Sequence, residues 1–175
     1  MKKNYLYVVA LLAMSLFVSA CVNSKSESKS EVKIEKWIQL FNGKDLHDWE
    51  VKIKGYELGD NFGNTFRVED GLMRVSYDQY DTFDERYGHI FYKGEFSNYI
   101  LRVEYRIYGE QCPNAPGWAY RNSGIMVHGQ PATSMDLDQD FPTSIEVQLL
   151  GSDSTVTRTN LNVCTPGTNI VIDDE

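Results

Sequence analysis

Two short runs of alternating polar and apolar residues bring ionisable side chains to positions from which they could act together. They cover residues 122–129 and 144–151. Because residues two apart in a strand share a face, Glu146 and Gln148 lie on one side of their strand and apolar residues on the other. Asn122 and His128 likewise share the face opposite the apolar residues of the first run. An acid, an amide and an imidazole on strand faces would form a rigid polar platform, and any chemistry is expected there.

The role of each histidine follows less directly from its position. His128 fits three roles, namely a general base, a metal ligand or a hydrogen-bonded structural side chain. His47 lies in a loop and His89 precedes a short apolar run, and both are interpreted as structural. We therefore add only His128 to Glu146 as a candidate catalytic residue.

Three aspartates at alternate positions, Asp136, Asp138 and Asp140, superficially resemble a calcium-binding loop. The following glycine and the distal glutamate of an EF-hand are missing. A solvated loop before the strand that carries Glu146 is the favoured interpretation. A divalent cation stays open as a cofactor, with no ligand set assigned.

Residues 99–108 form the longest predicted strand, and its polar face carries Arg102, Glu104 and Arg106. Taken alone, this face is typical of the solvated side of an antiparallel sheet. Combined with Glu146 and Gln148, it favours a functional platform. Charged groups, amides and aromatic rings are what a sugar site needs, because they supply hydrogen bonds to hydroxyls and flat surfaces for the ring.

A long irregular loop, residues 111–121, leads into the strand that begins at Asn122. Loops at the rim of a sheet often carry specificity. Trp118 and Tyr120 in this loop would either stack on a sugar ring or belong to a lid that packs for structural reasons. The sequence leaves both interpretations open.

The elements that must position these residues are short strands. Helical periodicity is scarce, and further strands are expected at residues 37–41, 49–53, 65–69, 72–77, 89–92 and 168–172. Their regular spacing, with Gly, Asn and Asp in the turns, is typical of an all-β antiparallel sandwich or jelly roll. Residues 173–175 begin a turn without a returning strand. Because such sandwiches often run to roughly 200–250 residues, we expect a fragment that is incomplete at its C-terminus.

Three segments are expected along the chain. Residues 1–21 combine a charged start, an apolar body and small residues before Cys21, which is the order of an export signal. The small residues before Cys21 resemble a bacterial lipobox, in which that cysteine is lipidated; an uncleaved anchor is the alternative. Residues 22–36 are typical of a flexible tether, and residues 37–175 form one domain. We expect this domain in the cell envelope, attached to a membrane and facing the periplasm or the cell exterior.

Composition limits the classes of partner. The chain is 42% hydrophobic and 13% aromatic, which suffices for one substantial core, and its formal net charge is -8. This charge argues against nucleic acid as a partner, because phosphate binding needs clustered Lys and Arg. Cys112 and Cys164 remain once Cys21 is assigned to lipid, and a disulfide between them stays open in an oxidising compartment.

Five motifs in one order carry a family resemblance, and they lie at residues 40–49, 68–72, 103–106, 122–125 and 145–148. From residue 37 onward the chain resembles the 3-keto-disaccharide hydrolase family. The resemblance implies a concanavalin A-like jelly roll that acts on glycosides already oxidised at carbon 3. A ketone there acidifies the proton on C2, so that a base can remove it, the C1 substituent can leave and water can add back.

The resemblance also implies roles for the candidate residues. Glu146 or His128 would be the base that removes the proton from C2. Arg106, Arg121 or a metal would hold the enolate oxygen. The residues that would orient the substrate hydroxyls are Glu104, Asn122 and Gln148.

Two other functions would use the same platform. A jelly-roll endoglucanase needs two carboxylates, roughly 5–9.5 Å apart. The second position on the strand is Gln148, however, and Glu104 would serve only if it lay opposite Glu146. A non-catalytic glycan-binding lipoprotein would need no base at all. In every case the expected ligand is a saccharide or glycoside.

Overall fold

The computed structural model describes residues 36–172. The account below concerns the unit that begins at Ile38. The predicted export signal, the predicted lipidation site at Cys21 and residues 22–35 of the predicted tether lie outside the described residues. Between residues 36 and 172, no helix is long and apolar enough to cross a membrane.

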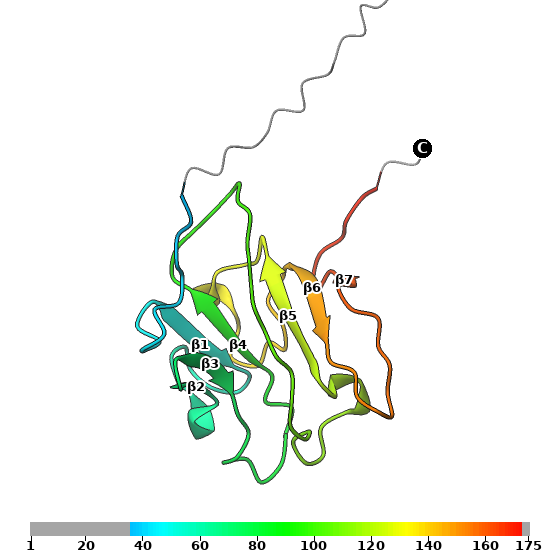
Figure 1. Cartoon of the computed structure of the whole chain (residues 1–175). Helices are drawn as coiled ribbons and strands as arrows, with labels where there is room; N and C mark the ends of the chain where they lie inside the picture. The colour runs from blue at the N-terminus through cyan, green and yellow to red at the C-terminus, as the bar shows by residue number, and fades with distance from the viewer. Residues whose placement is uncertain (1–35, 173–175) are drawn as a thin grey trace, which may run out of the picture. The chain divides into compact units, whose positions relative to one another are not determined.

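Seven strands form three small antiparallel sheets (Figure 1). The first sheet pairs β1 (Trp49–Ile53) with β4 (Gly88–Tyr92), and the second pairs β2 (Phe66–Glu69) with β3 (Leu72–Val75). The strand order of the third sheet is β5-β6-β7, and its bounds are Asn122–Val127, Ile145–Leu150 and Val163–Cys164. Short 3-10 helices η1, η2 and η3 occupy Phe62–Asn64, Gly117–Ala119 and Ala132–Ser134. The described residues are thus mostly β and irregular, without an α-helix, while a single jelly-roll sandwich is not formed.

Local turn chemistry explains the best-predicted hairpin. Asp70 and Gly71 join β2 to β3, and both adopt left-handed backbone angles, with φ of 52° and 75°. Asp-Gly is the preferred pair for a two-residue turn of this kind, because both central residues need positive φ. The sequence therefore predicts both this hairpin and its register, in which Glu69 faces Leu72.

The prediction of a strand at residues 99–108, the longest one expected, is wrong. The segment is extended and passes beside β5 (Figure 1, green), but it joins none of the three sheets. Its contacts are made by side chains: Tyr105 accepts a hydrogen bond of 2.6 Å from Asn160, and Ile107 lies against Gly151. Alternation predicts which side chains share a face, but a strand also needs a backbone partner along its edge.

The strands predicted at the two ends of the domain are not formed either. Residues 37–41 and 168–172 have no regular structure. The short strand β7, by contrast, was not predicted, because two residues carry no readable period. It exists because its backbone pairs with β6, where Cys164 faces Glu146.

The buried apolar residues form two small clusters. Val51, Ile53 and Phe66 pack together where the first two sheets meet. Tyr80, Phe83 and Cys112 form the second cluster. Cys112 is a free, buried thiol and Cys164 is also free, so the disulfide left open by the sequence is not formed.

A buried lysine ties β1 to a distant loop. Lys52 is only 3% exposed, and its ammonium group donates to the backbone carbonyls of Ile53, Tyr56 and Leu137. Three acceptors match the three donors of an ammonium group, which offsets the cost of burying the charge. The loop that precedes β6 is thereby fixed against the first sheet.

Candidate functional site

The register between β5 and β6 places the predicted acid and amide on one face. Met126 faces Glu146 and Gly124 faces Gln148, and residues directly opposite each other in an antiparallel pair share a face. By alternation Asn122, which faces Leu150, lies on the same side. The predicted arrangement of Glu146, Gln148 and Asn122 is therefore confirmed as a feature of the backbone.

Glu146 is a half-buried carboxylate. No hydrogen bond or ion pair to it occurs among residues 36–172, and burial raises the pKa of its carboxyl group. Gly124 makes this position available, since a β-carbon there would overlap the Glu146 side chain. A desolvated, unpaired carboxylate is energetically unfavourable, and such groups cluster at functional sites.

Gln148 is fixed through its backbone and free at its side chain. Its N–H donates to the carbonyl of Asn162, and its carbonyl accepts from Leu161, each at 2.9 Å. Within the described part of the chain, its side-chain amide makes no hydrogen bond. The amide can therefore donate to, or accept from, a bound molecule.

His128 lies just beyond the end of β5, in a left-handed conformation with φ of 50°. This turn takes the backbone out of the strand geometry, so the alternation that placed His128 beside Asn122 no longer applies. Its exposed ring lies near that of Tyr99, with 6.2 Å between the ring centroids. The described contacts do not join His128 to Glu146.

A second group of predicted residues gathers where η2 leads into β5. The side-chain amide of Asn122 donates to the carbonyl of Trp118 at 3.2 Å. The hydroxyl of Tyr120 donates to Asp153 at 2.5 Å, and the guanidinium of Arg158 donates to the carbonyls of Trp118 and Tyr120. Tyr120 is therefore engaged with its own protein, whereas Trp118 is 51% exposed.

Arg121 makes contacts that suit a structural role. Its guanidinium lies over the ring of Tyr120 and donates to the carbonyls of Ser152 and Gly109 at 3.0 and 3.5 Å. These bonds join two loops at the start of β5. Holding an enolate oxygen would require Arg121 to exchange them for contacts with a substrate.

Arg106 and Glu104 lie on the exposed segment 99–108. Glu104 pairs with Arg102 at 2.6 Å, and Arg106 lies over the ring of Tyr108. No contact in the described part of the chain brings either residue to Glu146. The structure thus separates these two residues from the group that β5 and β6 bring together.

The aspartates before β6 do not assemble a metal site. No group of three His, Cys, Asp or Glu side chains in residues 36–172 could hold a metal ion. Asp140 instead pairs with Lys54 at 2.7 Å, and its carbonyl accepts a hydrogen bond of 2.7 Å from His89. His89 is structural, as predicted, and burial lowers its pKa.

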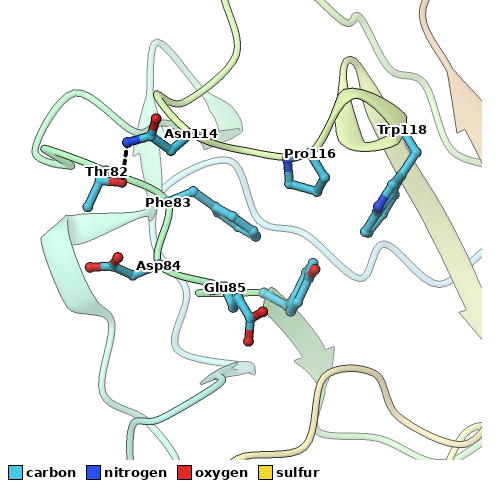
Figure 2. A pocket seen from close by; sticks show the side chains of 8 residues that line it. Thr82, Phe83, Asp84, Glu85, Asn114, Pro116 and Trp118 are labelled. Atoms are coloured by element: carbon cyan, nitrogen blue, oxygen red, sulfur yellow. Dashed lines mark hydrogen bonds between the residues drawn. The ribbon is translucent and has the colours of Figure 1, made fainter.

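A cavity that sequence reasoning missed lies between two loops (Figure 2). The loop before β4 contributes Asp84, Glu85 and Tyr87, and the loop before β5 contributes Asn114 and Trp118. Its one sequence signal is the charged and aromatic run 84–87, which interrupts the alternation just before a strand. The pairing of that run with Trp118 depends on tertiary contacts alone.

Comparison with known families assigns the chain. The model of the 3-keto-alpha-glucoside-1,2-lyase-like domain matches residues 36–167. The chain belongs to this family. The match spans all seven strands and includes Glu146, Gln148 and Trp118, and membership in the family indicates a carbohydrate-active enzyme. No curated protein and no solved structure matches the chain.

Proposed function

We propose that this protein cleaves glycosides already oxidised at carbon 3, by elimination followed by hydration. The ionised carboxylate of Glu146 removes the proton from C2, and the electron pair forms an enolate with the C3 carbonyl. Expulsion of the C1 substituent leaves an enone, and the leaving oxygen takes up a proton. Water then adds at C1 while C2 is reprotonated, which gives net hydrolysis.

The observation that carries this proposal is the burial of the Glu146 carboxylate, without a partner among the described residues, in a chain of this family. The pKa of this carboxyl group is raised. A general base works best when its pKa lies near the working pH, and desolvation moves a carboxyl group in that direction. A carboxylate held in an ion pair would be a weaker base.

The neighbouring amide supplies a hydrogen-bond donor. Gln148 shares the face of Glu146, opposite Gly124, and its side chain makes no bond within residues 36–172. We assign it to the enolate oxygen or to a substrate hydroxyl, since a hydrogen-bond donor beside that oxygen stabilises developing negative charge. His128 remains a second candidate for the base and is tested in parallel.

This arrangement favours elimination over ordinary glycoside hydrolysis. An endoglucanase needs an acid and a second carboxylate across the scissile bond. On this face the neighbouring position in β6 is occupied by Gln148, and Glu104 is paired with Arg102 on another segment. One base with a hydrogen-bond donor suits a substrate whose C2 proton is already acidic.

The experiment compares 3-keto-glucosides with their unoxidised parents, using the full chain with and without a chelator. We expect the parent glycosides to stay intact and the keto forms to release the aglycone. Glu146→Gln should lower kcat by about 10²–10⁴-fold, the range typical of general-base removal. His128→Asn, assayed alongside, reports whether the imidazole contributes.

A matched control comes from another strand. Glu50 is also half-buried on a strand and has no ion pair in the described residues, so Glu50→Gln should keep full activity. Cleavage of parent and keto forms at equal rates would identify a glucanase instead. Binding without cleavage of either would identify a glycan-binding protein, and either result would refute the proposal.

A further inference from the structure

The cavity between the loops before β4 and β5, here called the Trp118 cavity, is large enough for a sugar. Its volume is about 550 Å³, within the range of small-molecule sites. Figure 2 shows the side chains of Phe83, Pro116 and Trp118 extending toward a common space. The mechanism proposed for Glu146 uses none of these side chains.

One wall of the Trp118 cavity offers a flat apolar surface. The rings of Tyr87 and Trp118 stack, with 5.9 Å between centroids and 15° between planes. Trp118 is nevertheless 51% exposed. The stacked pair therefore keeps aromatic surface beside the cavity, and aromatic surface can receive the C–H groups of a sugar ring.

The opposite side of the cavity supplies hydrogen-bonding groups. The side-chain amide of Asn114 donates to the hydroxyl of Thr82 at 3.0 Å, as Figure 2 shows, which fixes the amide and leaves its oxygen to accept. Glu85 uses one carboxylate oxygen on Lys54 at 2.8 Å and keeps the other. These groups can hold the hydroxyls of a ring that lies on Trp118.

The charges around the cavity favour a neutral ligand. Its two carboxylates already have cationic partners, since Asp84 pairs with Arg86 at 3.1 Å and Glu85 with Lys54. A cationic ligand would have to compete with these ion pairs. A hydroxyl can instead bond to the carboxylate oxygens that the cations leave free.

A hydrogen bond links the backbone of Trp118, beside the Trp118 cavity, to the face of the sheet that carries Glu146. Asn122, at the start of β5, donates to the carbonyl of Trp118, and Met126, opposite Glu146, lies four residues further along the strand. Four residues of strand span about 13 Å. A substrate of more than one sugar ring can extend along this length of strand, from the residue bonded to Trp118 to the residue opposite Glu146.

We propose that the Trp118 cavity is a second saccharide subsite, which holds a neutral hexose ring of an extended substrate while a more distant ring reacts at Glu146. The inference rests on the proposed function for the reaction at that distant ring. The preferred substrates are therefore oligosaccharides rather than glycosides of a single sugar.

Binding tests the subsite without turnover. Calorimetric titration of the full chain uses unoxidised glucose tetrasaccharides, with α-1,4 or β-1,4 linkages, up to about 10 mM. We expect Trp118→Ala to weaken binding of the preferred tetrasaccharide at least tenfold and Asn114→Ala to weaken it severalfold. Phe96→Ala removes another exposed aromatic residue, 45% accessible, and should leave the affinity unchanged.

The results separate this inference from the proposed function. Wild-type protein that binds neither tetrasaccharide, or Trp118→Ala and Asn114→Ala variants that bind as tightly as wild type, would overturn the subsite. Binding that depends on Trp118, without cleavage of any keto-glycoside, would refute the proposed reaction alone. With both correct, kcat/KM for keto-oligosaccharides exceeds that for short keto-glucosides, and Trp118→Ala removes the difference.

Discussion

At the scale of single residues, the relation between Glu146 and Gly124 matters most. A carboxylate on a strand usually projects into water or finds a cationic partner, whereas Glu146 lies over a residue that has no side chain. Glu146 can occupy this half-buried position only because β5 has a glycine, without a side chain, at residue 124. Burial raises the pKa of the Glu146 carboxyl group by desolvation.

Gly124→Ala tests this dependence directly. The added methyl group overlaps the Glu146 side chain, so the carboxylate must move, and a shift of about 1 Å can cost 10²-fold in rate. We expect such a loss in kcat for 3-keto-glucosides. Gly117→Ala is the matched control, since nothing lies within 4 Å of a β-carbon there. Equal activity of both variants would refute the positioning role of Gly124.

Glu146 should also make stability depend on pH. Because its pKa is higher in the folded protein than the ordinary 4.5, ionisation favours the unfolded chain. The penalty is absent below pH 4.5 and complete above the folded-state pKa. Urea titrations should therefore show Glu146→Gln to be more stable than wild type at pH 7 and equally stable at about pH 4. A constant difference between the two, or none, would contradict this assignment.

At the scale of elements, the junction of η2 and β5 depends on the loop 152–158. Asp153 accepts bonds from the Tyr120 hydroxyl, from Thr155 and from the N–H of Val156. These bonds, with that of Tyr120 the largest contribution, lower the pKa of Asp153. Arg158 in the same loop donates to the carbonyls of Trp118 and Tyr120. The loop thus holds the backbone beside the Trp118 cavity.

Tyr120→Phe should raise the pKa of Asp153 toward that of an ordinary aspartate, as measured by NMR titration of its carboxyl carbon. The sign follows from the bond that is lost. A lowered carboxyl pKa favours the fold above the ordinary value of 3.8, and this contribution disappears as the pH falls through the lower folded-state pKa. Tyr105→Phe, whose hydroxyl bonds to Asn160, should not change this pKa. An unshifted Asp153 in Tyr120→Phe would contradict the assignment.

Segment 99–108 shows how an element can have the period of a strand without being one. Leu101, Val103 and Tyr105 alternate as a strand requires, yet they are 41%, 45% and 47% exposed. Alternation depends on the local chain, but a backbone ladder depends on a second segment at about 4.8 Å. The described residues contain no such partner for 99–108.

At the scale of the whole molecule, the proposed membrane attachment depends on a residue outside the described range. Lipidation of Cys21 would put a folded carbohydrate-active domain at a membrane surface. We expect full-length protein made in a bacterial host to incorporate labelled fatty acid and to fractionate with membranes. Cys21→Ser should abolish the label and release the protein into the soluble fraction. A variant that stays with the membrane would indicate an uncleaved anchor instead.

The sequence predicted those features that depend on neighbours along the chain. The hairpin at Asp70 and Gly71, the strands β1, β5 and β6, and the common face of Glu146 and Gln148 all follow from periods of two and from turn chemistry. Local periods and turn chemistry do not predict the free state of Cys164, the turn at His128 or the short strand β7. Each of these depends on which distant backbone lies alongside.

What the sequence determined by itself was the family, through motifs spread from residue 40 to residue 148, and the alternation that sets Glu146 beside Gln148. Only the tertiary structure decided that Glu146 lies over Gly124, with no partner among residues 36–172, and that Tyr87 stacks on Trp118. The physical reason is the separation along the chain of the residues that determine each feature. Side-chain direction within a strand is fixed by local backbone geometry, whereas burial and aromatic stacking arise between segments that meet only when the chain folds.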